Sequence, residues 1–495
     1  MRRLMDAAAP EGSAATTAGR LWAAAREALR SLALAAPALM FVLVYVGDEY
    51  RKPLRTTPVF LALGALALWL GRPRVPSAAP PPSPGGFWAR GSDRWGLRVV
   101  AVASFVLLAV LLSRRPYQGM VLYHLRGTGL WTAVTIAAAG LALVLARPPR
   151  PWIVLGILIA GDLAVRAFSL RQWEIHPAVR DMLPLVMSAI DSFLAGENPY
   201  AVHTMQIGSQ VPLTYPPAMW LAYLPARLAG IDIRWTSWLA DAVVAVALAW
   251  PAVRASGFGL RASGRSDASS GPAVPNPGPT WPALLFAATY LFLPDTHWNG
   301  IYAEPNVDWA VVAVLACCLA TGRPLAAGAA LGVAIAMRPL NFALVPLLAA
   351  GLWRVHGLRT AARSILVAAA VSAVLYVPFV LRDPDAFFLG AVRWLIEYGP
   401  AHRTWFHGML GFSGPLYEAR LEAWMHPAQI AGIAIALGLT AWRARSARGV
   451  LAGCAAAYSV FVAFSPLVWM SFWIGAVILV SAAVGMPPAR SAVGG

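Results

Sequence analysis

Residues 171–217 read RQWEIHPAVRDMLPLVMSAIDSFLAGENPYAVHTMQIGSQVPLTYPP, and this segment separates two long apolar runs. It concentrates titratable side chains that are sparse elsewhere in the chain, namely Glu174, His176, Asp181, Asp191, Glu197 and His203. Apolar runs of about 20 residues, long enough to cross a bilayer as a helix, recur on both sides of it. We therefore expect an all-α, polytopic membrane protein in which this segment is a polar loop at the membrane surface.

The composition favours the same class. Hydrophobic residues make up 59% of the chain and charged residues only 12%, whereas soluble domains carry about 25% charged residues. The net charge is +17, but the arginines lie in short connections, as the positive-inside pattern requires. Nucleic-acid binding would need a clustered basic patch, so we expect no nucleic-acid partner. The cysteines, Cys317, Cys318 and Cys454, lie in apolar runs without metal spacing, so we expect no metal and no cofactor.

The alternation of apolar runs with basic connections predicts about 13–14 transmembrane helices. Residues 1–30 are expected to form a basic cytoplasmic N-terminus, and residues 31–150 an extra region of about four helices. Residues 151–485 are expected to form the main membrane domain, followed by a cytoplasmic tail at 486–495.

Two long loops, 171–213 and 381–425, are expected on the outer side of the membrane, because the basic connections 72–98, 254–280 and 443–448 then fall on the cytoplasmic side. The connection 72–98 is rich in proline and glycine, and we expect no helix in it. The apolar run at 214–229, which follows the first of these loops, is of marginal length and is interrupted by Pro225. We expect it to lie in the outer interface rather than to cross.

Local structure is predicted most clearly after Asp181. The run MLPLVMSAIDSFLAG predicts an interfacial helix that ends in a turn at Gly196-Glu197-Asn198-Pro199-Tyr200. Glycine is suited to the left-handed geometry of such a turn, and proline restricts the next backbone angle. A carboxylate at the helix start, as at Asp181, either caps the helix or takes a proton from a hydroxyl as a general base. Both interpretations stay open on the local sequence alone.

Several short motifs follow one another between about residue 150 and residue 485. In order they are Asp181, the Gly196–Tyr200 turn, Tyr215-Pro216-Pro217, Ala303-Glu304-Pro305-Asn306, Arg338-Pro339, the run WFHGMLG at 405–411, and Ser465-Pro466 with Trp469. This series resembles the glycosyltransferases of the C superfamily, most closely family 87, the polyprenyl-phosphate-mannose-dependent mannosyltransferases. The chain departs from the family pattern where Glu304 stands in place of Gln and Arg338 in place of Lys.

The resemblance implies the glycosyltransferase C architecture, with a catalytic site on the outer side of the cell (inner) membrane. Inverting transfer from a polyprenyl-phosphate sugar needs one base for the acceptor proton and positive or donor groups for the leaving phosphate. The resemblance implies Asp181 as the base. The substrate- and phosphate-binding residues that it implies are Arg338, His407, Arg403, Glu304, Asn306, Asn198, Tyr200 and Tyr215.

Other interpretations of the charged residues are simpler. Arg338 is compatible with snorkelling at the interface, and Glu304 with holding a helix junction together. Asp162 and Arg166 stand four residues apart in an apolar run, and we expect them to pair. We interpret Asp241 as a packing contact within its helix.

These observations predict a membrane hexosyltransferase, with mannose as the favoured sugar. The expected donor is a polyprenyl-phosphate sugar, and the expected acceptor is a lipid-linked or cell-envelope glycan. The alternatives are a transporter or flippase of lipid-linked saccharides and a non-catalytic membrane scaffold. A transporter would more often bury its carboxylates in the middle of the membrane.

Overall fold

The computed structural model describes part of the chain. It comprises residues 29, 32–40, 42–43, 59, 61–62, 64–65, 87–112, 128–146, 149–170, 175, 182–204, 210–253, 281–293, 296, 306–394, 411–465 and 470–485. These residues are mostly helical, which confirms the expected all-α class in its coarse form.

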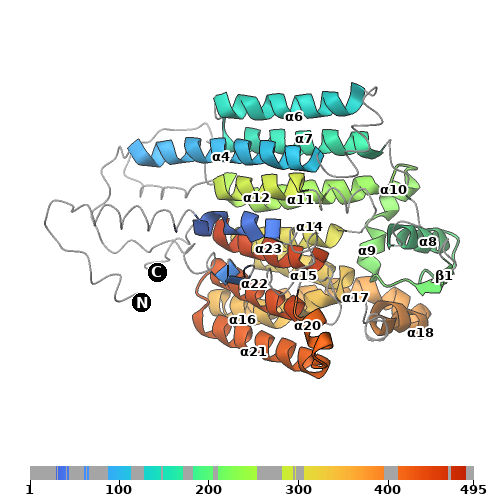
Figure 1. The fold of residues 1–495 in the computed structure, drawn as a ribbon. Helices are drawn as coiled ribbons and strands as arrows, with labels where there is room; N and C mark the ends of the chain where they lie inside the picture. The colour runs from blue at the N-terminus through green and yellow to red at the C-terminus, as the bar shows by residue number, and fades with distance from the viewer. Residues whose placement is uncertain are drawn as a thin grey trace, which may run out of the picture.

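Twelve long helices lie side by side in the described residues and form the body of the molecule (Figure 1). They are α4 (Phe87–Leu112), α6 (Thr128–Ala146), α7 (Pro151–Leu170), α11 (Arg234–Val253), α12 (Trp281–Phe292), α14 (Val307–Ala320), α15 (Pro324–Met337), α16 (Leu344–His356), α17 (Leu358–Arg382), α21 (Met425–Arg443), α22 (Ala447–Ala463) and α23 (Met470–Gly485). Helices joined by short connections, such as α14 and α15, contact each other and run antiparallel. One apolar core cluster contains buried side chains of all twelve helices. Few of them come from α17 and α21, namely Ala361, Ala368 and Ala436.

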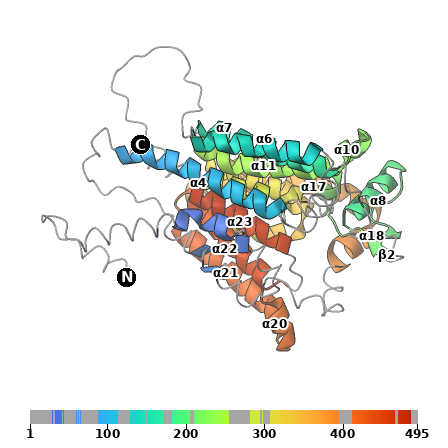
Figure 2. The ribbon, with the colours of Figure 1, turned by 45° about the horizontal axis from the view of Figure 1, so that its top comes forward.

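Short elements gather at one end of this bundle (Figures 1 and 2). They are α8 (Met182–Leu194), β1 (Val202–Thr204), β2 (Gln210–Pro212), α9 (Pro217–Leu221), α10 (Leu224–Leu228), α18 (Pro384–Phe388) and the π-helical turn η3 (Leu389–Arg393). Three further short elements belong to other connections, namely η2 (Pro339–Ala343), α20 (Ser413–Glu418) and η5 (Glu422–Trp424). The strands β1 and β2 pair antiparallel, with His203 opposite Val211.

A second apolar cluster fastens this end to the bundle. It contains Leu183 and Ile190 of α8, Trp220 of α9, Met337 of α15 and Phe387 of α18. Because α8 and α18 are about 200 residues apart in sequence yet share this cluster, the two segments that were expected to be outer loops pack together.

Helices α15 and α17 approach each other closely at two glycines of α15. A methyl group at Gly328 would overlap the carbonyl oxygen of Ser364, and one at Gly332 would overlap that of Ala368. Small residues spaced four apart let helix backbones approach closely, as in many helix pairs inside membranes. The small-residue run before Arg338 therefore sets how α15 lies against α17.

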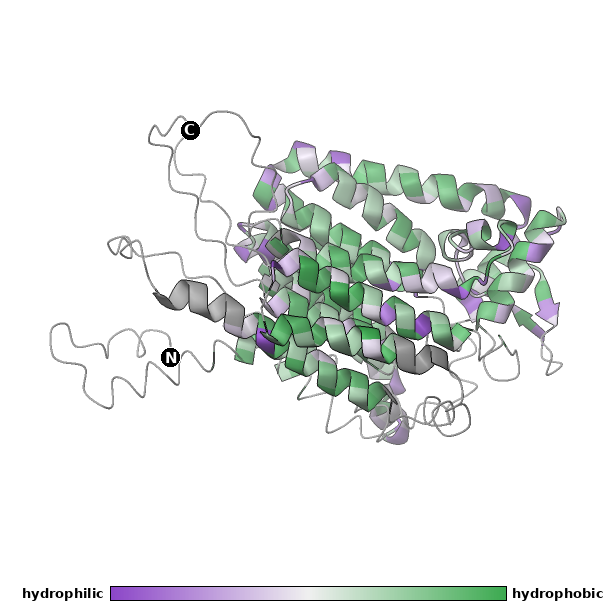
Figure 3. Cartoon of the chain, turned by 90° about the horizontal axis from the view of Figure 1, so that it is seen from above, coloured by the Kyte–Doolittle hydropathy of each residue, from purple (hydrophilic) through white to green (hydrophobic). Residues whose placement is uncertain are grey.

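The outward faces of the bundle are apolar (Figure 3). On α17, Leu366, Val374 and Leu381 are 68–76% exposed, and on α21 Ile430 and Ile435 are exposed as well. Among the described residues, two helices are long and apolar enough to cross a membrane, Pro151–Phe168 and Leu358–Arg382. In a water-soluble helix the outward face is normally polar.

One expectation about the helices is wrong. Helix α4 begins at Phe87, so the last part of the 72–98 connection is helical, contrary to our expectation. The prolines of that connection end at Pro84, and the residues after Gly86 include none to interrupt a helix. Residues 214–229 form the five-residue helices α9 and α10, each far too short to cross a bilayer. The first half of the extra region expected at 31–150 lies largely outside the described residues.

Candidate functional site

The turn after α8 has the geometry that its sequence predicts. Gly196 has a φ of +79°, in the left-handed region that glycine tolerates. Arg382, at the end of α17, donates a hydrogen bond to the Gly196 carbonyl oxygen. Asn198 donates from Nδ2 to Asp383 Oδ2 at 2.9 Å, and its own Oδ1 accepts from the Tyr200 backbone N–H at 3.0 Å. Two consecutive residues of the second outer segment therefore hold this turn in place.

Tyr200 and Tyr215 hold the loop together internally. The Tyr200 hydroxyl donates to the Tyr215 carbonyl oxygen at 3.0 Å, and Trp220 Nε1 donates to the same hydroxyl at 3.4 Å. The Tyr200 ring packs 4.8 Å from that of Phe387 and 6.0 Å from that of Phe379, centroid to centroid. Burial raises the pKa of Tyr200 well above its usual range, so the phenol stays protonated and donates. The Tyr200 hydroxyl thus bonds to the loop backbone while its ring packs against α17 and α18, and the expectation that both tyrosines bind substrate stays a prediction.

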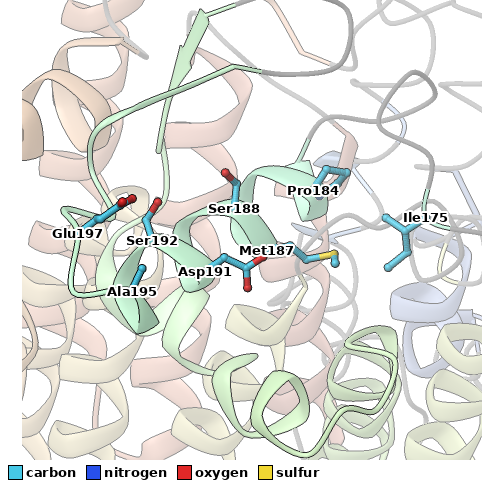
Figure 4. Close-up of a pocket in the computed structure, with 8 residues that line it drawn as sticks. All are labelled: Ile175, Pro184, Met187, Ser188, Asp191, Ser192, Ala195 and Glu197. Carbon is cyan, nitrogen blue, oxygen red and sulfur yellow. The ribbon is translucent and has the colours of Figure 1, made fainter.

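A pocket of about 550 Å³ opens along α8 (Figure 4). Its lining combines apolar side chains with hydroxyls and carboxylates: Ile175, Pro184, Met187, Ser188, Asp191, Ser192, Ala195 and Glu197. A volume in the range of 300–1,000 Å³ is typical of small-molecule sites. Asp191 forms a two-pronged ion pair with Arg227 of α10, with both N–O distances 2.9 Å. The pocket therefore lies along one face of α8, and Arg227 of α10 holds one of the carboxylates that line it.

Arg338 lies where α15 ends, at the same end of the bundle as this pocket. Its backbone is extended, with φ −149° and ψ 121°, as expected for a residue that precedes a proline. Arg338 Nε lies 2.8 Å from Asp308 Oδ2, and its guanidinium lies over the Phe472 ring, 5.0 Å from the centroid. Asp308 stands in the first turn of α14, where the helix dipole favours a negative charge. The guanidinium is thus held between a carboxylate and an aromatic face.

A second charged cluster lies inside the bundle, and we call it the Arg166 cluster. It comprises Asp162 and Arg166 of α7, Asp241 of α11, Tyr290 of α12 and Asn306. Arg166 Nε donates to Asp162 Oδ1 at 3.0 Å, which confirms the pairing that the four-residue spacing predicts. Arg166 Nη1 donates to Asp241 Oδ2 at 2.5 Å. The three charged side chains are fully buried, so their mutual pairing replaces the water that each has lost.

Asp241 does more in this cluster than the packing contact that we expected. Its Oδ1 accepts hydrogen bonds from the Tyr290 hydroxyl at 2.6 Å and from Asn306 Nδ2 at 2.9 Å. The partners come from different helices and are separated by 49 to 75 residues in sequence. Local sequence gives no signal for such a contact. Asn306 also precedes α14 directly, so it connects the Arg166 cluster to the helix that carries Asp308.

Four of the predicted site residues lie outside the described residues: Asp181, Glu304, Arg403 and His407. The roles that the resemblance implies for these four residues therefore stay predictions. Asp181 immediately precedes α8, the helix that lines the pocket. Within the described residues, no group of three His, Cys, Asp or Glu side chains is arranged to hold a metal.

Comparisons of the chain with family models, with curated proteins and with solved structures find no match. The resemblance to the glycosyltransferase C superfamily therefore depends on the order of the short motifs alone.

Proposed function

We propose that the chain is a polytopic membrane glycosyltransferase that moves a hexose, with mannose as the favoured sugar, from a polyprenyl-phosphate donor to a lipid-linked or envelope glycan. The reaction would take place on the outer side of the cell membrane and would invert the anomeric centre. One observation carries the proposal. An acidic, hydroxyl-lined pocket on α8 and the guanidinium of Arg338 at the end of α15 both lie at the same end of an apolar bundle.

Support for the membrane setting comes from the outward faces of the helices. Large apolar side chains such as Leu366, Val374 and Ile430 are exposed around the bundle, whereas monomeric soluble proteins rarely expose large continuous apolar surfaces. Within a bilayer, helices satisfy their own backbone hydrogen bonds and place such side chains against lipid. A polyprenyl donor has a long hydrocarbon chain, so a site at the end of such a bundle would be reached from within the membrane.

Support for phosphate recognition comes from Arg338. A guanidinium can bind two phosphate oxygens at once through its N–H groups, and its stacking over Phe472 fixes its plane. Asp308 holds it on one side. An arginine close to the hydrocarbon is costly and usually has a function, and stabilising the charge on a departing polyprenyl phosphate is a function that fits.

The proposed reaction also needs a general base, and we assign this role to Asp181. In the proposed reaction, its carboxylate takes the proton from an acceptor hydroxyl as the oxygen attacks the anomeric carbon. The bond between that carbon and the phosphate oxygen breaks at the same time, and the polyprenyl phosphate leaves with the electron pair. One positioned base is typically worth about 10²–10⁴ in rate.

The first prediction tests this assignment with Asp181→Asn. Asparagine still caps a helix but cannot accept a proton at neutral pH, so we expect transfer from a defined polyprenyl-phosphate mannose to fall about 10²–10⁴-fold. The matched control is Glu304→Gln, because glutamine is the residue that the resembling family carries there. We expect that variant to keep much of its activity. An active Asp181→Asn protein beside an inactive Glu304→Gln protein would transfer the role of base to Glu304.

A transporter or flippase of lipid-linked saccharides is the second candidate, and the Arg166 cluster favours it. Charged residues buried within a membrane often lie on ion or substrate pathways. However, every charged side chain of this cluster pairs with another member. Reconstituted vesicles distinguish the two functions, because a flippase moves a labelled lipid-linked sugar across the bilayer without an acceptor, whereas the transferase consumes donor only when acceptor is present.

A further inference from the structure

The α8 pocket has a floor made by one face of a single helix. Pro184, Met187, Ser188, Asp191 and Ser192 are three or four residues apart, so their side chains project from the same face. Figure 4 shows Glu197 beyond the end of the helix, with its carboxylate turned toward Ser192. The pocket thus has an apolar part near Pro184 and Met187 and a polar part near the turn.

Ser188 presents an acceptor to this pocket because of its bond to His203. His203 Nε2 lies 2.9 Å from the Pro199 carbonyl oxygen, which only accepts, so Nε2 carries a proton. In the neutral imidazole the other ring nitrogen, Nδ1, is then an acceptor. Nδ1 lies 2.9 Å from Ser188 Oγ, so the Ser188 hydroxyl donates its proton to His203. The lone pairs of that hydroxyl remain to accept a hydrogen bond from a ligand.

The two carboxylates add further acceptors. Asp191 is fixed by Arg227, and Glu197 is held by its backbone, whose N–H donates to the Ser192 carbonyl oxygen at 2.8 Å. The neighbours of Glu197 on both sides, Gly196 and Asn198, are tied to the start of the second outer segment. Within the described residues the Glu197 carboxylate forms no hydrogen bond or ion pair with another side chain. The Glu197 backbone is therefore held beside the pocket, and its side chain is exposed.

A ligand that fits this pocket must supply hydrogen-bond donors and must not be an anion. Phosphate would meet two carboxylates and a hydroxyl that offers lone pairs, and like charges at contact distance repel. A sugar supplies several O–H donors, and its C–H faces suit the side chains of Pro184 and Met187. We propose that the α8 pocket binds the saccharide part of the acceptor, with Glu197 and Asp191 as acceptors for its hydroxyls. The assignment to the acceptor rather than the donor rests on the proposed function.

Binding of an unmodified disaccharide tests this inference separately from transfer. The full-length protein is purified in a detergent with a zwitterionic headgroup, because sugar-headed detergents would compete for the pocket. Tritiated mannobiose is the first probe, with chitobiose and cellobiose as the other arms, each at up to about 10 mM, since weak sites have Kd values in the millimolar range. We expect saturable binding of at least one probe that inorganic phosphate does not displace.

Variants locate the site. Glu197→Gln replaces a charged acceptor with a neutral one and is expected to weaken binding about five- to tenfold. Ser192→Leu fills the polar part of the pocket with a good helix former, and we expect it to abolish detectable binding while the thermal unfolding temperature stays near that of the parent. Asp385→Asn removes an exposed carboxylate of α18 outside the pocket and serves as the matched control, with binding unchanged.

The outcomes separate the two hypotheses. Absence of binding by all three disaccharides, displacement by phosphate, or binding that Ser192→Leu and Glu197→Gln leave unchanged would overturn the inference. A protein that binds a disaccharide in the pocket but transfers nothing from a polyprenyl-phosphate sugar contradicts the proposed function alone. The pocket assignment alone is contradicted if the protein transfers the sugar and both variants, Glu197→Gln and Ser192→Leu, bind the disaccharide with the parent's affinity.

Discussion

Arg166 and Arg338 both place a positive charge among apolar helices, but the surroundings of the two guanidinium groups differ. Arg166 lies within α7 between Asp162 and Asp241, and all three side chains are fully buried. Arg338 lies at the end of α15 beside the short elements, and its side chain is 12% exposed. The charge of Arg166 is paired wholly within the bundle, whereas we propose that the charge of Arg338 meets the donor phosphate.

Removing the charge of Arg166 should have the largest effect on stability. Arg166→Met leaves Asp162 and Asp241 buried without a cation, and breaking a buried ion pair in this way typically costs about 3–5 kcal/mol. We expect reversible unfolding in mixed micelles to show a loss of that size. The triple variant Asp162→Asn, Arg166→Met, Asp241→Asn removes all the charges together and should recover most of the stability.

The packing role of Arg166 would be wrong if Arg166→Met kept the parent's stability but lost transfer. Arg166 would then act in the reaction or in transport rather than in packing. If the triple variant stayed as unstable as Arg166→Met, the hydrogen bonds to Asp241 rather than the charges would hold the helices together.

The second prediction of this comparison concerns Arg338. The double variant Asp308→Asn, Arg338→Gln removes both charges, so no unpaired carboxylate remains and folding should be close to that of the parent. If Arg338 stabilises the leaving phosphate, transfer should fall about 10²–10³-fold, the typical loss for one such donor. The measurement is kcat/KM with a defined polyprenyl-phosphate sugar, beside an unfolding curve for the same preparation. Full activity in the double variant would place Arg338 with Arg166 as a packing group.

Those parts of the molecule that depend on local sequence could be predicted, and those that depend on distant contacts could not. Helix α8, the left-handed Gly196 and the Asp162–Arg166 pair follow from spacing and residue type within a few positions. The pairing of Arg338 with Asp308 spans 30 residues and joins two helices that the sequence only shows to be apolar.

Asp241 illustrates the same limit. As a lone carboxylate in an apolar run it was interpreted as a packing contact, because nothing near it in the sequence indicates Arg166, 75 residues away. The α8 pocket depends likewise on the distant partners of the turn, Arg382 and Asp383. The assignments of Asp181, Glu304, Arg403 and His407 stay predictions, because these residues lie outside the part of the chain that the structure describes.

The last prediction compares two buried tyrosines whose hydroxyls donate to acceptors of different charge, although the Tyr200 hydroxyl also accepts a long bond from Trp220 Nε1 at 3.4 Å. Tyr290 donates to the carboxylate of Asp241 at 2.6 Å, whereas Tyr200 donates to the neutral carbonyl of Tyr215 at 3.0 Å. Hydrogen bonds to charged groups contribute about 1.5–3 kcal/mol and neutral ones about 0.5–1.5 kcal/mol. Phenylalanine keeps the ring and most of the packing, so each substitution removes little more than the hydroxyl.

We therefore expect Tyr290→Phe to lower the free energy of unfolding by about 1.5–3 kcal/mol and Tyr200→Phe by about 0.5–1.5 kcal/mol. Unfolding of both variants under one set of conditions checks the order. Since Tyr200 belongs to the loop end and Tyr290 to the bundle interior, Tyr200→Phe should also leave α15 and the Arg338–Asp308 pair unchanged. If instead Tyr200→Phe were the more destabilising change, the loop end would stabilise the fold more than the Arg166 cluster does. The Arg166 cluster would then not be the main polar contribution to stability, and the end with the short elements would have a structural role as well as the proposed ligand-binding one.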